Sequence, residues 1–164
     1  MGELCVRLVA DARFSASGRS MRVLHPRATA SVFERPVLAR VRRLCLALPE
    51  TAETESWGHP NFRAGTRTFC TCEIVNGRPS IAFRLAPPEV ERVSRRRYFF
   101  ATPYGRGLWI SRWVDHAVDW REIATLLEHS YRRVANKRML GALQSVAEAA
   151  RPRRSSRGPR KNRS

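Results

Sequence analysis

The residues best suited to chemistry lie close together in the segment Trp57–Arg63, which reads WGHPNFR. Gly58 permits positive φ and Pro60 fixes its own φ, so the backbone here is shaped to present its side chains in a set geometry. His59 carries an imidazole that titrates near neutral pH, as acid–base chemistry requires. Arg63 offers a planar fork of donors that matches carboxylate and phosphate. The segment therefore has groups for anion binding or for proton transfer.

Catalysis would need partners for His59 that the sequence does not supply. No nucleophile elbow, phosphate-binding loop or metal-ligand spacing accompanies it. Cys70 and Cys72 would point to the same face of one strand, but a third and a fourth metal ligand are not evident, so we expect buried thiols there. The sequence predicts a protein without enzymatic activity, bound metal or cofactor.

An excess of arginine is the second chemical feature. The 164 residues carry a formal net charge of +17. Residues 34–150 hold nineteen Lys or Arg against twelve Asp or Glu, so much of the excess lies outside them. A positive surface attracts nucleic acid non-specifically. We expect polyanion binding, by a folded domain that is less basic than the total charge suggests.

Hydrophobic periodicity and turn residues predict the elements that position these groups. Pro49 ends the first helix, Asn76-Gly77 is a strong hairpin signal, and Asp119 matches a helix N-cap with Glu122 three residues later. The predicted elements are a helix over 35–48, a loop over 50–56, strands over 67–75 and 79–85, a short helix from Pro87, strands over 98–101 and 108–114, a helix from Asp119 to Val134, and a helix over 137–150. This order predicts an α+β fold, a mostly antiparallel sheet with helices packed on it.

Composition predicts one folded domain over residues 34–150. Residues 1–33 are expected to form a poorly ordered N-terminal extension, and residues 151–164 a basic, disordered tail. No run of about 18 or more apolar residues predicts a membrane span. The four cysteines have no disulfide-framework spacing, which favours reduced thiols and a cytoplasmic location.

Several short motifs point to a known family. They are Leu46-Ala47-Leu48-Pro49, Trp57-Gly58-His59-Pro60 followed by Phe62-Arg63, Phe69 at the start of a strand, Pro103-Tyr104 before Gly107 and Trp109, Asp119-Trp120, and Lys137-Arg138. With these motifs the sequence resembles the MmcQ/YjbR family over roughly residues 36–143. The resemblance implies a double-wing α/β fold, similar to YjbR and CyaY, and DNA binding. Arg67 and Arg84 stand where members often carry Lys, and Asn136 where Pro is common; arginine keeps the charge but changes the donor geometry.

Charge and resemblance together predict binding of duplex DNA, with no predicted sequence preference, through hairpins that act as basic wings. The predicted site consists of Trp57, His59, Arg63, Arg67, Arg84, Arg106, Trp109, Arg112, Lys137 and Arg138. Arg106 and Arg112 in particular are expected to contact phosphate. An alternative hypothesis is a cleft around Trp57, His59 and Trp109 that binds a small anion or a protein. In the purely structural interpretation, Trp57 and Trp109 are core or rim aromatics.

Overall fold

The structure is a computed structural model that describes residues 35–149. The predictions for residues 1–33 and 151–164 lie outside the described residues. In chain order the elements are α2 (Arg35–Leu46), β1 (Thr51–Ser56), β2 (His59–Ala64), β3 (Arg67–Val75), β4 (Arg78–Arg84), α3 (Pro87–Ser94), β5 (Phe99–Ala101), β6 (Trp109–Trp113), α4 (Trp120–Val134) and α5 (Lys137–Ala149).

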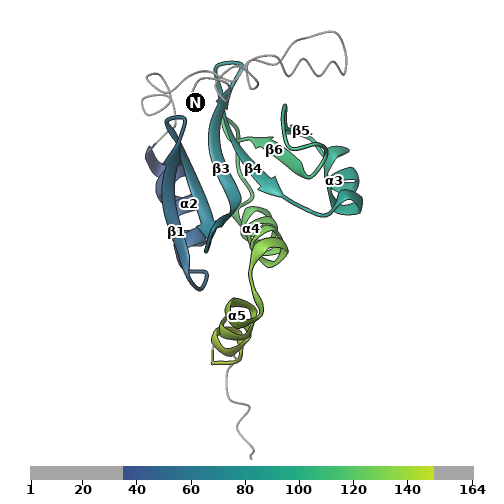
Figure 1. The fold of residues 1–164 in the computed structure, drawn as a ribbon. Helices are drawn as coiled ribbons and strands as arrows, with labels where there is room; N and C mark the ends of the chain where they lie inside the picture. The colour runs from purple at the N-terminus through teal and green to yellow at the C-terminus, as the bar shows by residue number, and fades with distance from the viewer. Residues whose placement is uncertain (1–34, 150–164) are drawn as a thin grey trace, which may run out of the picture.

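The strands form one six-stranded sheet in the order β1-β2-β3-β4-β6-β5, and each neighbouring pair is antiparallel. Figure 1 shows α2 behind β1, α4 below the middle strands, and α3 beside β5 and β6. The predicted α+β class is therefore confirmed. Each predicted helix is present, and so are the strands from β3 to β6, within a few residues of the predicted bounds.

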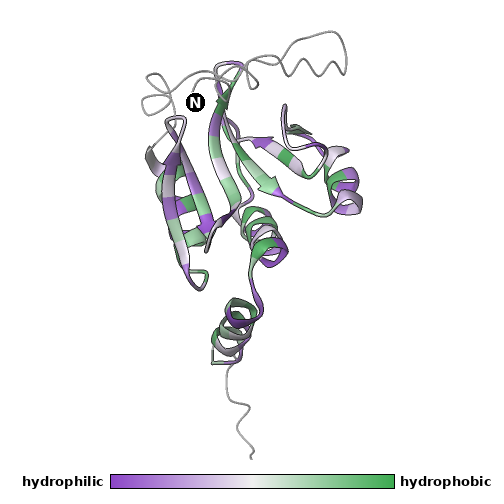
Figure 2. Cartoon of the chain, viewed as in Figure 1, coloured by the Kyte–Doolittle hydropathy of each residue, from purple (hydrophilic) through white to green (hydrophobic). Residues whose placement is uncertain are grey.

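The core lies between one face of the sheet and the helices α2 and α4. Phe62, Cys70, Phe83 and Ile110 occupy matching positions on β2, β3, β4 and β6, and all four are fully buried. Helix α4 packs across β3 and β4, and Figure 2 shows that one of its sides is apolar and the other hydrophilic. A helix with such a stripe gains stability by burying it against a sheet.

Local chemistry explains where α4 begins and how it is held. The carboxylate of Asp119 accepts hydrogen bonds from the backbone N–H groups of Arg121 and Glu122, as an N-cap does. Tyr131 is fully buried, and its hydroxyl donates to the carbonyl of Pro49 at 2.9 Å. The C-terminal half of α4 is thereby tied to a residue that follows α2.

Three tight turns share one backbone geometry. Both central residues have positive φ in Trp57-Gly58 (57° and 73°), Asn76-Gly77 (50° and 75°) and Arg106-Gly107 (49° and 76°). This is the type I′ geometry that matches the twist of a β-hairpin, and glycine at the second position adopts it without steric cost. The hairpin predicted at Asn76-Gly77 is confirmed, and the Trp57 motif is also a hairpin turn.

The predicted loop over residues 50–56 is wrong, because most of it is strand β1. This strand pairs only with β2 and lies at the edge of the sheet. An edge strand with one exposed side tolerates a sequence of Thr and Glu without an apolar stripe. The side chain of Glu53 receives three hydrogen-bond contacts from Arg42 of α2, at 2.8 to 2.9 Å, which holds β1 against that helix.

Candidate nucleic-acid interface

The antiparallel register gathers most of the predicted site at one end of the sheet. Ala64 at the end of β2 pairs with Arg67 at the start of β3, and Arg84 at the end of β4 pairs with Trp109 at the start of β6. Arg63 lies one residue before Ala64. Four predicted site residues from four strands therefore share this end.

The start of α5 lies at the same end. A Cβ atom added to Gly65, in the β2–β3 turn, would lie 3.3 Å from Cε of Met139 in α5. Arg138 forms an ion pair at 2.5 Å with Glu50, which precedes β1. Lys137 and Arg138, which precede Met139, are thus near the β2–β3 turn. Figure 1 shows α5 below the sheet.

Arg106 reaches this end through the turn between β5 and β6. The backbone N–H of Leu85 donates to the carbonyl of Leu108, which extends the β4–β6 pairing past Arg84. Arg106 is exposed at the tip of that turn. We call this region the basic end; the predicted site residues that it holds are Arg63, Arg67, Arg84, Arg106, Trp109, Lys137 and Arg138.

Arg133 also lies at the basic end, although the sequence patterns do not single it out. It is exposed in the last turn of α4. Ser130, three residues earlier, accepts the backbone N–H of Arg84 at 2.8 Å and donates to the carbonyl of Phe69. Ser130 therefore fixes the end of α4 against the ends of β3 and β4. Helical spacing alone could have marked Arg133 as exposed, but only the packing shows which end it lies on.

All but one of the cations at the basic end have no carboxylate partner among the described residues. Within the described residues, ion pairs hold Arg42 to Glu53, Arg78 to Asp115, Arg92 to Glu89, Arg95 to Glu91, Arg96 to Glu122, Arg132 to Glu128, and Arg138 to Glu50. Among residues 35–149, no carboxylate pairs with Arg63, Arg67, Arg84, Arg106, Arg133 or Lys137. The basic end therefore holds positive charge that the folded domain does not neutralise.

Two residues of the basic end are held in place by the fold. Arg63 is half-buried, and its Nη2 donates to the carbonyl of Thr66 at 2.6 Å, which directs it along the β2–β3 turn. Trp109 is half-buried beneath Gly105, where an added Cβ atom would lie 2.2 Å from its Cδ1. Trp109 supports the β5–β6 turn that carries Arg106.

The segment before that turn is anchored on the sheet face opposite α2 and α4. The hydroxyl of Tyr104 donates to Oε1 of Glu73, and the hydroxyls of Thr102 and Ser111 are 2.8 Å apart. Glu73 is only 4% exposed, and burial raises the pKa of its carboxyl to about 7 although the hydrogen bond from Tyr104 opposes that change. The wing that presents Arg106 is thus connected to a buried acid.

The structure does not bring Trp57 and His59 to the basic end. Trp57 is 62% exposed in the β1–β2 turn, while His59 is buried at the start of β2. The five residue steps from His59 to Ala64 separate the two ends of β2 by about 17 Å. Trp57, His59 and Trp109 therefore do not line one cleft.

Arg112 does not lie on an exposed surface. It is 4% exposed, and its guanidinium donates to the carbonyls of Trp113 at 3.0 Å and Ala117 at 3.3 Å. Burial lowers the pKa of its guanidinium. Arg112 is therefore not placed to contact phosphate as expected. It lies on the inner face of β6 with Ile110, and its hydrogen bonds hold the chain that follows the strand.

No cluster of three or more His, Cys, Asp or Glu that could hold a metal exists among residues 35–149. Cys45, Cys70 and Cys72 are buried and free, and burial raises the pKa of the Cys70 thiol well above its ordinary value. None of the described helices is long and apolar enough to cross a membrane.

The fold resembles that of solved structures with little sequence identity. A protein from Pseudomonas syringae superposes with a TM-score of 0.50 at 12% identity, over 62% of this chain and 97% of that chain. The Deinococcus radiodurans protein DR2400, a DUF419 domain, superposes with a TM-score of 0.54 at 18% identity, over 65% of this chain and 87% of that chain. No curated protein matches the sequence.

The family model named YjbR matches residues 46–133, which span β1 to nearly the end of α4. The matched residues include every strand of the sheet, the turns that carry Trp57 and Arg106, and Ser130. They stop before Lys137 and Arg138. More than half of the chain fits the family model, and the protein belongs to the YjbR family.

Proposed function

We propose that this protein binds duplex DNA through the basic end of its sheet, and that it does so in the cytoplasm without enzymatic activity or a cofactor. The observation that supports the proposal is the convergence of unpaired cations from β2, β3, β4, α4 and α5 and from the β5–β6 turn. Six other arginines of the described domain are paired with carboxylates, whereas these cations remain available to an external anion.

The geometry suits a phosphate backbone. Arg63 and Arg67 flank the β2–β3 turn, and Arg106 forms the tip of the β5–β6 turn, so the two turns act as the basic wings. Between them, Arg84 lies beside the half-buried Trp109. Contacts of this kind position a protein on a duplex and carry little sequence information. Low sequence specificity is therefore part of the proposal.

The test compares two triple variants of the full chain that remove the same charge. One is Arg67→Ala/Arg84→Ala/Arg106→Ala, at the basic end. The matched control removes paired arginines that lie away from the basic end. It is Arg78→Ala/Arg92→Ala/Arg95→Ala. Fluorescence anisotropy of a labelled duplex across a salt series measures the affinity and its dependence on salt.

The basic-end variant is expected to reduce the slope of log affinity against log salt by about 0.9 for each phosphate that it no longer binds. The control should keep a slope close to that of the unmodified chain. Any contribution from residues outside the folded domain is the same in both variants. Equal reductions in the two would show that affinity follows net charge alone, and would contradict the proposed site.

A further inference from the structure

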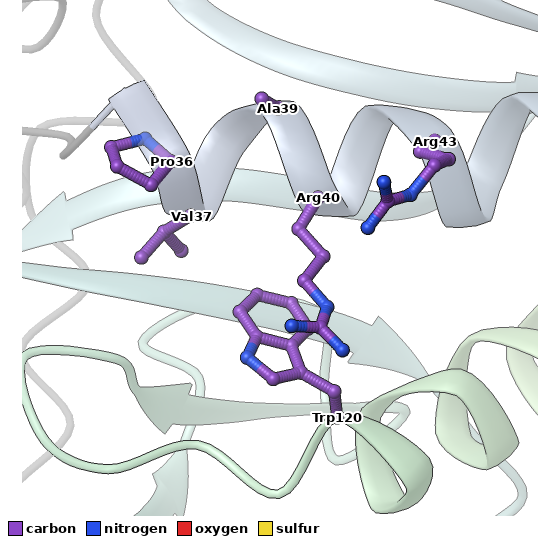
Figure 3. Close-up of a pocket in the computed structure, with 6 residues that line it drawn as sticks. All are labelled: Pro36, Val37, Ala39, Arg40, Arg43 and Trp120. Carbon is purple, nitrogen blue, oxygen red and sulfur yellow. The ribbon is translucent and has the colours of Figure 1, made fainter.

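A pocket separate from the basic end lies between α2 and the start of α4 (Figure 3). It has a volume of about 330 Å³ and is lined by Pro36, Val37, Ala39, Arg40, Arg43 and Trp120. Trp120 is the first residue of α4, ten residues before Ser130 at the basic end. At 1.5 Å per residue, about 15 Å of helix separates the pocket from the proposed DNA site.

Two arginines of α2 line this pocket. Arg40 stacks over the indole of Trp120, with its Cζ 4.8 Å from the ring centroid, and Arg43 follows one helical turn later (Figure 3). Stacking orients the flat face of a guanidinium and leaves its N–H edges able to donate. The pocket thus presents an oriented fork and a second cation beside it.

The charge of these two arginines is not neutralised within the described residues. No described carboxylate pairs with Arg40 or Arg43, whereas their neighbour Arg42 points to β1 and binds Glu53. The carboxylate beside Trp120 is that of Asp119, which accepts the backbone N–H groups at the start of α4. The pocket is therefore positive.

The remaining lining is apolar. Pro36, Val37 and Ala39 of α2 are among the lining residues, and Val37 lies on the side of α2 that faces the indole of Trp120 (Figure 3). The volume of the pocket is at the lower end of the range for ligand-binding sites, which suits a molecule about the size of a single ring. A site with an apolar wall and two donors matches a molecule with an apolar body and one acidic group.

We infer that this pocket binds a small organic anion. Its carboxylate or phosphate accepts hydrogen bonds from Arg40 and Arg43, and its apolar part lies against Val37 and Trp120. The inference does not depend on DNA binding, because it uses none of the residues of the basic end.

The experiment follows the indole N–H signals of the full chain by ¹H–¹⁵N NMR, with the Trp120 signal assigned from Trp120→Phe. The probes are phenyl phosphate and benzoate, with inorganic phosphate and phenol as the separate halves of the first probe. Saturable shifts of the Trp120 signal are expected with phenyl phosphate, benzoate or both, and the better probe identifies the preferred acid. Each half alone should bind at least about tenfold more weakly.

Arg43→Ala is expected to weaken binding of the better probe by about tenfold or more, because it removes a charge-assisted hydrogen bond. The matched control is Arg42→Ala, which removes an exposed arginine of the same helix that is paired with Glu53. The backbone signals report whether each variant is folded. The inference is overturned if neither probe shifts Trp120, if inorganic phosphate binds as well as phenyl phosphate, or if the two variants weaken binding equally.

Discussion

At Glu73 the fold buries a carboxyl group whose Oε2 has no hydrogen-bond partner among the described residues. Its Oε1 accepts from the hydroxyl of Tyr104, while burial disfavours the charged form. The pKa of the Glu73 carboxyl in the folded state is about 7, against an ordinary value of 4.5. Since the folded state holds this proton more tightly than the unfolded chain, ionisation of Glu73 opposes folding.

Stability is therefore expected to fall as the pH rises from about 4.5 to about 7, with no further decrease from this group above that range. Glu73→Gln keeps an acceptor for Tyr104 and removes the charge. At pH 8 the variant should be more stable than the unmodified chain, by roughly 3 kcal/mol at most, and near pH 4 the difference should vanish. Urea unfolding at both pH values measures this.

Glu55→Gln is the control, because Glu55 is exposed on β1 and its carboxylate stays in contact with solvent. Its effect on stability should be small at both pH values. A gain from Glu73→Gln that is equal at pH 4 and pH 8 would show that the carboxyl is not the titrating group.

Arg112 shows how much of a residue's role the sequence could have revealed. Its alternation with Ile110 and with Val114, the residue after β6, places all three on one face, and the other two are buried. Inspection of that pattern would have predicted an inward-facing arginine. The carbonyls of Trp113 and Ala117 that satisfy it could not be foreseen, because the path of the chain after β6 is set by the packing of α4.

At the level of elements, the β5–β6 turn depends on the absence of a side chain at Gly105. Its φ is +85°, and an added Cβ atom would lie 2.2 Å from Cδ1 of Trp109. Gly107 in the same turn has a φ of +76° but has nothing within 4 Å of an added Cβ atom. Substitutions at these two glycines therefore distinguish the cost of backbone strain from the cost of steric overlap.

Gly107→Ala is expected to cost about 1 kcal/mol of stability, because alanine disfavours positive φ. Gly105→Ala should cost about 1 to 3 kcal/mol more, since Trp109 must also move. Chemical denaturation of both variants measures the difference. Similar costs in the two would mean that Trp109 gives way freely, and that it does not hold the turn.

Strands β3 and β4, which the sequence predicts, are more buried than the edge strand β1, which it does not predict. Strands β3 and β4 are buried over most of their length and have the β-branched and aromatic residues of a central strand. Strand β1 lies at an edge and is only partly buried, so its Thr and Glu residues resemble a loop. The Asn76-Gly77 turn was predictable from its residue types, whereas tryptophan is an unusual residue at the first central position of Trp57-Gly58.

For the whole molecule, the antiparallel order explains why the candidate site was partly predictable. Residue types identified the basic side chains, but their placement depends on which end of each strand they occupy. Arg63, Arg67 and Arg84 come together only because β2, β3 and β4 pair. Trp57 and His59 are close to Arg63 in the sequence, but the length of β2 places them at the opposite end of the sheet.

The contribution of α5 to the fold differs along its length. Met139 and Leu143 are buried, Arg138 is paired with Glu50, and Val146 is 58% exposed. Backbone amides of residues 144–149 are expected to exchange with deuterium through local fraying, at close to no free-energy cost. The central amides of α4 should exchange only on global unfolding.

Hydrogen exchange resolved by residue tests this comparison, with α4 as the internal control in the same sample. Equal protection of residues 144–149 and of α4 would show that the whole of α5 is part of the cooperative core.

The three buried thiols of α2 and β3 have a consequence for the reactivity of the chain. Cys45, Cys70 and Cys72 are fully buried and all three thiols have a raised pKa, so thiolate forms rarely and reagents have no access. An alkylating reagent can modify these sulfur atoms only after α2 separates from the sheet. The rate at which Cys45, Cys70 and Cys72 are labelled therefore reports on the opening of the core, and these thiols are an intrinsic probe of that opening.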